Sequence, residues 1–373
     1  MTIFGTRPEA VKMAPVIKVL RKHAEKIAIQ VCITAQHREM LDQVLDVFDI
    51  TPDIDLNLMQ PDQSLSDLTA QIFLTLAPVL KEKKPDWVLI QGDTTTVMAA
   101  ALLGYYLRIK IGHIEAGLRT GDKWQPFPEE INRRVAGVVA DLHFAPTENN
   151  RQNLLNEGIP NSQIVVTGNP VIDALNLIAQ KPLPPLSKKL LKQAGVSSGD
   201  RKLVLVTAHR RENFGKPIRN ICSALKHLAD AYTDDITIIY PVHLNPNIQQ
   251  PVYEILAKVD NILLLPPLDY LPLIHLMKHA ALILTDSGGI QEEAPSLGIP
   301  TLVMRERTER QEGIDAGTLQ LVGTDPKRIL SAARRLLDDP AAHAAMAGAV
   351  NPYGDGHAAE HIVSALLERW DAA

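Results

Sequence analysis

The fold of this chain is decided by the stretch Thr285-Asp286-Ser287-Gly288-Gly289-Ile290-Gln291-Glu292-Glu293, which directly follows the apolar run Ala281–Leu284. The apolar run predicts a buried strand, and the segment after the two glycines predicts a helix. The glycine turn leaves its backbone N–H groups unobstructed, so the turn and the helix N-terminus can together hold a diphosphate. The two glutamates lie about one turn into the helix, where a carboxylate can accept hydrogen bonds from a ribose diol. The stretch therefore indicates a nucleotide-bound substrate, although a plain strand–turn–helix connection also explains the two glycines taken alone.

Strands and helices alternate along the rest of the chain, which is typical of parallel sheets wound by crossover helices. Strands are expected at 2–4, 28–33, 87–90, 111–115, 142–145 and 164–167, and again at 202–207, 236–240, 262–265, 282–285, 301–304 and 319–322. The proline-rich segment Lys181–Ser187 should be neither regular helix nor interior strand, so the domain linkage should lie just before it. We therefore expect an α/β fold of two Rossmann-like domains whose parallel sheets face each other across a cleft.

The length of 373 residues fits two domains. The expected N-terminal domain spans residues 1–172, and the expected C-terminal domain spans residues 173–353. The last helix, within residues 354–373, should pack back on the first domain.

Composition limits the classes of protein to which the chain can belong. The hydrophobic content of 46% is ordinary for a soluble α/β protein, and the formal net charge of −5 argues against broad nucleic-acid binding. No apolar run approaches the ~20 residues of a membrane span, and no signal peptide is apparent, so no membrane partner is expected. Cys32 and Cys222 are isolated, which predicts reduced thiols in a cytoplasmic protein.

The sequence gives no sign of a metal or a dinucleotide cofactor. The twelve histidines are scattered without the spacing of metal ligands. No Gly-x-Gly-x-x-Gly motif follows a strand. We therefore expect a protein that uses no cofactor.

Clustered polar residues follow three of the strands expected in the first half. Arg7 and Lys12 come after the first strand, where they can meet an anion near a helix start or form a surface charge pair. Asp93 follows the third strand, where it can act in a site or cap the next helix. Glu115 ends the fourth strand, and burial there would disfavour its charged form and suit it to proton transfer; an ion pair with Arg119 is the alternative.

Further candidates stand at later element ends. Glu129 lies in the first turn of a helix, where it can serve catalysis or simply favour the helix dipole. In the second half, the segment His209-Arg210-Arg211 follows a strand and predicts a loop that contacts an anion. His243 ends the next strand, and the arginines of Arg305–Arg310 can complement phosphate charge or form a solvated charge run.

Taken in order, these segments resemble one family closely, the non-hydrolysing UDP-N-acetylglucosamine 2-epimerases of bacteria. The similarity runs nearly from end to end and is carried by Phe4–Ala10, Thr34–Met40, Gly92–Thr96, His113–Arg119, His209–Glu212, Asp286–Ser296 and Asn351–Gly356. The resemblance implies a GT-B fold, a homodimer, and reversible conversion of UDP-GlcNAc to UDP-ManNAc for surface polysaccharide synthesis, without metal or nicotinamide. It also implies elimination of UDP to an enzyme-bound 2-acetamidoglucal, followed by re-addition of UDP.

The resemblance further assigns roles to individual residues. The acid/base set would be Asp93, Glu115 and Glu129, with His209 near the diphosphate or assisting proton transfer. Substrate would be bound by Arg7 and Lys12 on the sugar side, Ser287, Gly288 and Gly289 at the diphosphate, Glu293 at the ribose, Arg310 at the phosphate or sugar, and Leu268 and Leu273 beside uracil. A second UDP-GlcNAc, an activator, would be bound by Gln36, His37, Arg211 and His243.

Three other functions remain open at the level of sequence. A GT-B glycosyltransferase would share the nucleotide cradle but would need an acceptor site. An epimerase paralogue for another 2-acetamido UDP-sugar would change the sugar pocket alone. A sugar-nucleotide sensor would have no use for Asp93, Glu115, Glu129 and His209 together, which argues against that function.

Overall fold

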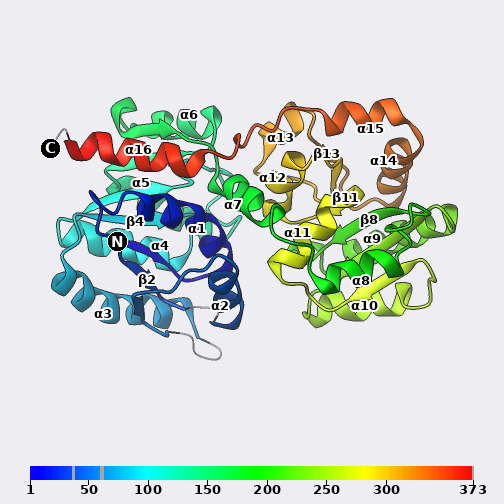
Figure 1. Cartoon of the computed structure of the whole chain (residues 1–373), viewed down its shortest axis with the longest axis horizontal. Helices are drawn as coiled ribbons and strands as arrows, with labels where there is room; N and C mark the ends of the chain where they lie inside the picture. Colours follow the sequence, from blue (N-terminus) through cyan, green and yellow to red (C-terminus); the bar gives the residue numbers. More distant parts are fainter. Residues whose placement is uncertain (36–37, 59–62, 372–373) are drawn as a thin grey trace. The chain divides into compact units, whose positions relative to one another are not determined.

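Each half of the chain folds around its own parallel sheet. The computed structural model describes residues 1–35, 38–58 and 63–371. Unit 1 comprises Met1–Ala174 and Tyr353–Ala373, and unit 2 comprises Leu175–Pro352 (Figure 1). The prediction of an α/β fold with two parallel-sheet domains is therefore confirmed.

The sheet of unit 1 has seven parallel strands among the described residues. They are β1 (Thr2–Phe4), β2 (Val31–Ile33), β3 (Ile54–Asp55), β4 (Trp87–Gln91), β5 (Lys110–Ile114), β6 (Leu142–Ala145) and β7 (Ile164–Val166). Their order across the sheet is β3-β2-β1-β4-β5-β6-β7. The order reverses between β1 and β4, and doubly wound sheets bind ligands at the carboxyl ends of the strands at such a switch point.

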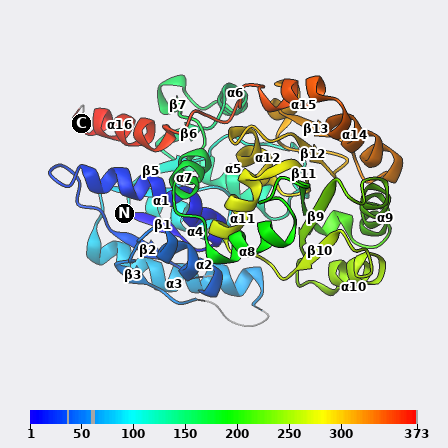
Figure 2. The same cartoon turned by 45° about the vertical axis from the view of Figure 1, so that its right-hand side comes forward.

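Helices cover this sheet. They are α1 (Arg7–Lys22), α2 (Arg38–Val47), α3 (Leu65–Lys83), α4 (Thr95–Tyr106), α5 (Glu129–Val139), α6 (Glu148–Asn156) and α16 (Ala358–Asp371). Helix α1 contacts both α2 and α16, and α4 packs between α3 and α5 (Figures 1 and 2). Ser64, Thr94 and Thr147 cap α3, α4 and α6, because each hydroxyl accepts a hydrogen bond from the backbone N–H three residues later.

The C-terminal segment is fastened to unit 1 by backbone hydrogen bonds. Asp173 lies in α7 (Pro170–Ala179), and its carboxylate accepts from the N–H groups of Ala358 and Ala359 at 3.2 and 2.9 Å. Burial raises the pKa of Asp173, and these two N–H donors oppose that shift. The N–H of Asn169 donates to the carbonyl of Tyr353 at 2.7 Å. The first turn of α16 is therefore capped by a side chain that precedes it by 185 residues.

The sheet of unit 2 has six parallel strands, again counted over the part of the chain that the structure describes. They are β8 (Lys202–Thr207), β9 (Ile236–Pro241), β10 (Ile262–Leu265), β11 (Ala280–Thr285), β12 (Thr301–Val303) and β13 (Leu319–Leu321), in the order β10-β9-β8-β11-β12-β13. The switch point lies between β8 and β11.

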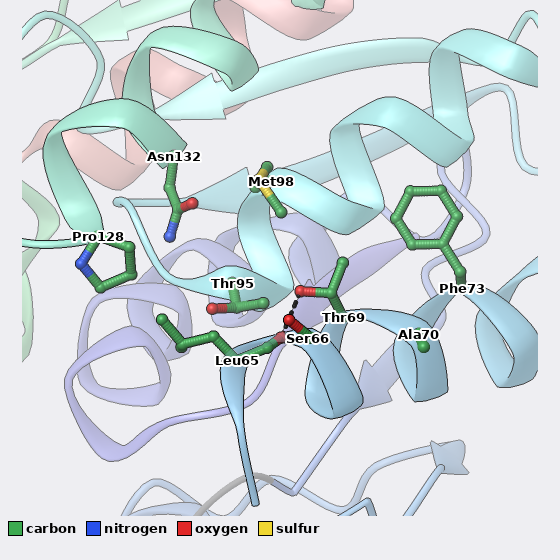
Figure 3. A pocket seen from close by; sticks show the side chains of 9 residues that line it. All are labelled: Leu65, Ser66, Thr69, Ala70, Phe73, Thr95, Met98, Pro128 and Asn132. Carbon is green, nitrogen blue, oxygen red and sulfur yellow. Dashed lines mark hydrogen bonds between the residues drawn. The ribbon is translucent and has the colours of Figure 1, made fainter.

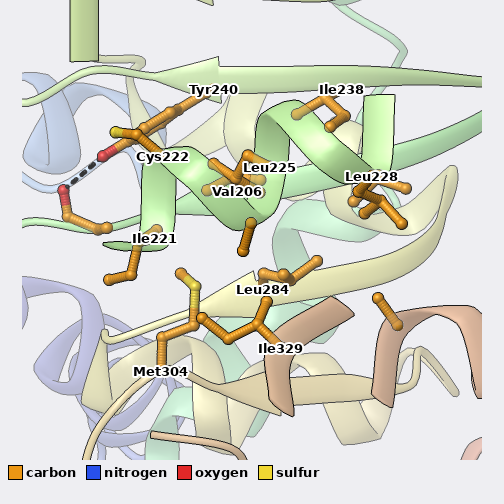
Figure 4. Close-up of a cluster of buried hydrophobic side chains, with 14 of the residues drawn as sticks. Val206, Ile221, Cys222, Leu225, Leu228, Ile238, Tyr240, Leu284, Met304 and Ile329 are labelled. Carbon is orange, nitrogen blue, oxygen red and sulfur yellow. Dashed lines mark hydrogen bonds between the residues drawn. The ribbon is translucent and has the colours of Figure 1, made fainter. Parts of the chain in front are cut away.

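The helices of unit 2 enclose one large apolar core. They are α8 (Pro185–Gln193), α9 (Lys216–Ala231), α10 (Pro246–Leu256), α11 (Tyr270–Lys278), α12 (Gly288–Ser296), α13 (Gln311–Asp315), α14 (Pro326–Asp338) and α15 (Pro340–Ala347). Leu225 of α9 and Ile329 of α14 meet Val206 and Leu284 of the sheet in this core (Figure 4). The phenol of Tyr240 is buried with them and donates to the carbonyl of Ala208 at 3.0 Å.

Two local expectations from the sequence were wrong. The two-residue edge strand β3 was not predicted, because two residues are too few to show a hydrophobic period. The segment Lys181–Ser187 was expected to be non-helical throughout, yet α8 begins at Pro185. Proline is well suited to the first helical turn, where its missing N–H has no partner to lose.

Among the described residues, no helix combines the length and the apolar composition needed to cross a bilayer.

Candidate functional site

Polar residues meet at the switch point of unit 1. Arg7 and Lys12 lie in the first turns of α1 after β1, Asp93 follows β4, and Glu115 follows β5. Glu115 and Lys12 are buried, whereas Arg7 and Asp93 are partly exposed. The structure therefore brings four of the residues chosen from the sequence to one edge of one sheet.

Cations and amides surround the carboxylate of Glu115. Its Oε2 contacts the Nζ of Lys12 and accepts from the Nε2 of Gln91 at 3.1 Å and the Nδ2 of Asn169 at 3.2 Å. Its Oε1 lies 3.4 Å from Nη2 of Arg133. Two cations and two amides therefore contact the carboxylate at the end of β5.

The alternative partner considered for Glu115 is engaged elsewhere. Arg119 forms an ion pair with Glu157, with 2.7 Å between Nη2 and Oε2. Glu115 is thus part of the cluster at the strand ends and not of the pair that Arg119 forms with Glu157.

Arg133 is a functional candidate that the sequence argument did not single out. Its guanidinium contacts the carboxylate of Asp93 and the backbone carbonyl of Glu115, and its side chain is 5% exposed. The amide of Asn132 donates to the carbonyl of Asp93 at 3.0 Å. The sequence feature that could have identified Arg133 is its spacing from Glu129. Arg133 stands one helical turn after Glu129 on α5, so both side chains lie on the same side of that helix.

In unit 2, one buried carboxylate organises the loop after β8. Asp286 is fully buried and accepts from the backbone N–H of His209 and of Arg210, at 2.8 and 2.9 Å, and from the amide of Asn213 at 2.9 Å. Its Oδ1 also lies 3.3 Å from Nδ1 of His209. Asp286 was part of the quoted stretch, but this supporting contact was not foreseen.

The imidazole of His209 contacts both the carboxylate of Asp286 and the ring of His243. It stacks on the ring of His243 with 5.8 Å between centroids. Burial lowers the pKa of His209, and the nearby Asp286 acts in the opposite direction. Burial also lowers the pKa of Arg210, with Arg305 the next cause. A bound anion would therefore favour the protonated forms of His209 and Arg210, which both lie on this loop.

The helix after β11 begins earlier than predicted, because Gly288 and Gly289 are its first two residues and not a turn that precedes it. Ser287 is the N-cap residue of α12, and the helix begins at Gly288. A Cβ added at Gly288 would lie 3.0 Å from Cζ of Arg310, so the guanidinium packs directly against the helix N-terminus. Glu292 holds Arg310 there, with 2.9 Å between Oε1 and Nη2. The N-terminus of α12 and an arginine fixed beside it together suit a diphosphate.

The other predicted binding residues of unit 2 lie on α11, on α12 and in the segments that follow β8 and β10. The Oε1 of Glu293 accepts from the phenol of Tyr270 at 2.7 Å. Leu268 follows β10, Leu273 lies in α11, and both are partly exposed. Arg211 is exposed on the loop after β8.

Two predicted positions have no structural description. Gln36 and His37, named for a second ligand, lie outside the described residues. In the ranges that are described, no group of three or more His, Cys, Asp or Glu side chains has the arrangement of a metal site.

Comparison with known proteins adds the family context. Residues 19–367 match the family model for UDP-N-acetylglucosamine 2-epimerase. The chain is 55% identical over 368 residues to the UDP-N-acetylglucosamine 2-epimerase of Salmonella typhimurium, covering 98% of this chain and 97% of that protein. The corresponding protein of Yersinia pestis is 54% identical with the same coverage.

Solved structures agree with the sequence relatives. The UDP-GlcNAc 2-epimerase of Neisseria meningitidis, bound to UDP-GlcNAc, matches with a TM-score of 0.92 and 50% identity, over 98% of this chain and 99% of that one. The MnaA–UDP structure from S. aureus matches with a TM-score of 0.90 and 47% identity, over 100% and 97% of the two chains. These matches confirm the predicted GT-B fold class.

Proposed function

Because the chain belongs to the UDP-N-acetylglucosamine 2-epimerase family and is an enzyme of that class, we propose that it interconverts UDP-GlcNAc and UDP-ManNAc by eliminating and re-adding UDP. The observation that carries the mechanism is the cluster at the switch point of unit 1, where Lys12 and Arg133 hold the carboxylates of Glu115 and Asp93. Fixed carboxylates in such a cluster are suited to moving a proton at a carbon with no activating neighbour.

The proposed steps balance without a cofactor. One carboxylate removes the proton at C2 of the sugar while the C1–O bond breaks and UDP departs with the bonding electrons, leaving a C1–C2 double bond. A second acidic group then returns a proton to the opposite face of C2, and a phosphate oxygen of UDP attacks C1. Asp93, Glu115 and Glu129 form the set from which the acid and the base come.

Unit 2 supplies the proposed UDP site. The departing diphosphate would be stabilised by the N-terminus of α12, with Ser287, Gly288 and Gly289, and by Arg310 and His209. Glu293 would accept from the ribose, and Leu268 and Leu273 would lie beside uracil. Arg7 and Lys12 of unit 1 would serve the sugar.

The test is NMR of the purified protein with UDP-GlcNAc in D2O, without added metal or nicotinamide. We expect UDP-ManNAc, with deuterium at C2 in both sugar nucleotides at equilibrium. Free ManNAc with UDP as the main product would contradict the proposal in favour of hydrolysis. UDP binding without conversion would favour a transferase or a paralogue with another sugar.

We also propose that the chain forms a homodimer through the outer face of α3, α4 and α5. Leu74 and Val138 are 75% and 80% exposed there, and Tyr105 and Tyr106 are also exposed. A hollow of about 510 Å³, lined by residues that include Phe73 and Met98, lies between these helices (Figure 3). Large apolar side chains gathered on one face are typical of association surfaces.

Leu74→Glu and Val138→Glu should each shift the mass measured by light scattering from dimer to monomer. Val350→Glu is the matched control, because Val350 is 83% exposed but belongs to unit 2. A monomeric wild type would refute the dimer, and an unchanged dimer in both variants would refute this face.

Two further assignments belong to the same proposal. A second UDP-GlcNAc would activate the enzyme by contacts with Arg211 and His243, and with Gln36 and His37 outside the described residues. Both Arg211 and His243 are exposed, and His243 stacks on His209, which could carry the effect to the UDP site. We place the reaction in the cytoplasm and its product in surface polysaccharide synthesis; the free, buried thiols of Cys32 and Cys222 are compatible with a reducing compartment.

A further inference from the structure

One buried carboxylate at the switch point of unit 1 has no part in the proposed chemistry. Glu9 lies at the third position of α1 and is 2% exposed. Its Oε2 accepts from the N–H of Gly5 at 3.1 Å, and from the N–H and hydroxyl of Thr6 at 2.8 and 2.7 Å. These bonds complete a capping box and fix the loop that leads into Arg7.

The other oxygen of Glu9 reaches a different loop. Its Oε1 accepts from the hydroxyl of Thr94 at 2.8 Å, across 85 positions of the sequence. Thr94 directly follows Asp93 and caps α4 through the same hydroxyl. One side chain therefore ties the loop after β1 to the loop after β4, on the two sides of the point where the strand order reverses.

A capping box accounts for the contacts of Oε2 but not for that of Oε1. The box is complete with Oε2 alone, so the bond to Thr94 has another consequence, which is the spacing of the two loops. The first loop has little freedom to adjust, because a Cβ at Gly5 would lie 2.0 Å from Oγ1 of Thr34. With that loop fixed, the bond to Thr94 adds to the contacts of Arg133 and Asn132 with Asp93, and it is the one of the three that relates Asp93 to the loop of Arg7 and Lys12.

We propose that Glu9 is a positioning residue, which holds Asp93 in register with Arg7 and Lys12 through the hydroxyl of Thr94. The proposal rests on the proposed function for the role of Asp93, although the link between the loops is independent of it. Misplacement of a reacting group by about 1 Å can reduce turnover ~100-fold. A small shift of Asp93 after loss of the Thr94 hydroxyl should therefore lower kcat measurably.

The central comparison is Thr94→Val against Thr94→Ser. Valine removes the hydroxyl that reaches Glu9, whereas serine keeps it. Thr147→Val is the matched control, since it removes an N-cap hydroxyl of α6 in the same unit without touching either loop. Glu9→Gln should behave like wild type, because its carbonyl can take the place of Oε2 and its amide can donate to Thr94.

We expect Thr94→Val to lower kcat by about 10-fold or more while KM for UDP-GlcNAc changes by less than about 3-fold. Thr94→Ser, Glu9→Gln and Thr147→Val should stay within about 3-fold of wild type in kcat. A loss in Thr147→Val equal to that in Thr94→Val would overturn the proposal, because capping alone would then explain it. So would an unchanged kcat in Thr94→Val.

Hydrogen exchange separates this inference from the proposed function. In the absence of substrate, Thr94→Val should speed amide exchange in residues 91–97 beyond the effect of Thr94→Ser. If wild type fails to convert UDP-GlcNAc yet this difference is found, the proposed function fails and the link between the loops stands. Equal exchange in the two variants would refute the link whatever the activity.

Discussion

Glu115 has a backbone conformation that few residues other than glycine adopt. Its φ is +63°, in the left-handed region, directly after β5. Such a conformation costs on the order of 1–2 kcal/mol and persists only where surrounding contacts impose it. Here the contacts are those of Lys12 and Arg133 with its carboxylate and of Arg133 with its carbonyl. The strained turn therefore fixes the direction of the carboxylate at the strand end.

The roles proposed for Asp93 and Glu115 predict that their substitution lowers turnover without weakening UDP binding. Asp93→Asn and Glu115→Gln should each lower kcat by at least about 100-fold, since each replaces a group able to exchange a proton. The dissociation constant for UDP, measured by calorimetry, should stay within about 3-fold, because the groups proposed to bind UDP lie in unit 2.

Glu157→Gln is the matched control for these variants. Glu157 is also a carboxylate of unit 1 paired with a buried arginine, but it lies away from the strand ends. Its loss should leave kcat unchanged. Turnover at the wild-type rate in either Asp93→Asn or Glu115→Gln would show that the assigned role is wrong.

Glu9 predicts a specific dependence of stability on pH. Burial raises the pKa of Glu9 from 4.5 to about 7, against the effect of its hydrogen-bond donors. The native state therefore holds this proton more tightly than the unfolded state, and the free energy of unfolding falls as pH rises from about 4.5 to about 7. Relative to Glu9→Gln, wild type should lose up to about 3 kcal/mol across that window, measured by urea unfolding. A constant difference between the two proteins from pH 4.5 to 8 would contradict the assignment.

The residue types of the site could be predicted from sequence, but their partners could not. Asp93 and Glu115 stood out because polar residues that end apolar strands gather at one edge of a parallel sheet. Arg133 did not, because its contacts depend on how α5 packs over β4 and β5, which no local pattern encodes. For the same reason the sequence suggested Arg119 as a partner of Glu115, whereas the fold pairs it with Glu157.

At the scale of elements, the start of α12 depends on one missing side chain. A methyl group at Gly288 would lie 3.0 Å from Cζ and Nη1 of Arg310, so the guanidinium would have to shift where Glu292 now holds it. Gly288→Ala should lower the stability of the ligand-free protein by about 1 kcal/mol, or about 2–4 °C in Tm, and weaken UDP binding by about 10-fold. Scanning calorimetry and titration calorimetry would measure the two effects.

Gly289→Ala provides the comparison for that variant. The nearest atom to an added Cβ there is Oε2 of Glu293, at 3.9 Å, which is ordinary contact. Its ligand-free Tm should therefore not fall. Equal losses of Tm in the two variants would mean that Arg310 does not set the packing at this turn.

Elements were predictable where the hydrophobic period was long or the turn chemistry was clear. Strands β8 and β10 begin and end at the expected residues. The expected strand at 28–33 is shorter in the structure, since β2 begins only at Val31. The apolar residues before it continue the pattern but form no ladder, because β1 is only three residues long and offers no further partners.

At the scale of the whole molecule, the two units carry separate sheets and separate cores. Saturating UDP should slow hydrogen exchange chiefly in residues 208–215 and 286–293 of unit 2. At about 100 times its dissociation constant, UDP should stabilise the unit that holds it by about 2.7 kcal/mol. Protection confined to residues 5–12 and 91–97 would instead mean that UDP binds to unit 1, which would contradict the proposed site in unit 2.

The capping of α16 by Asp173 also bears on how the protein is made. Unit 2 is one uninterrupted segment, whereas unit 1 is assembled from both ends of the chain. On the ribosome, unit 2 can finish folding before α16 has emerged, and only after α16 emerges can it reach Asp173 and pack against α1. The unit that carries Asp93 and Glu115 is therefore completed only after all of unit 2 has been synthesised, and a nascent chain stalled before α16 would present a finished unit 2 with an unfinished unit 1.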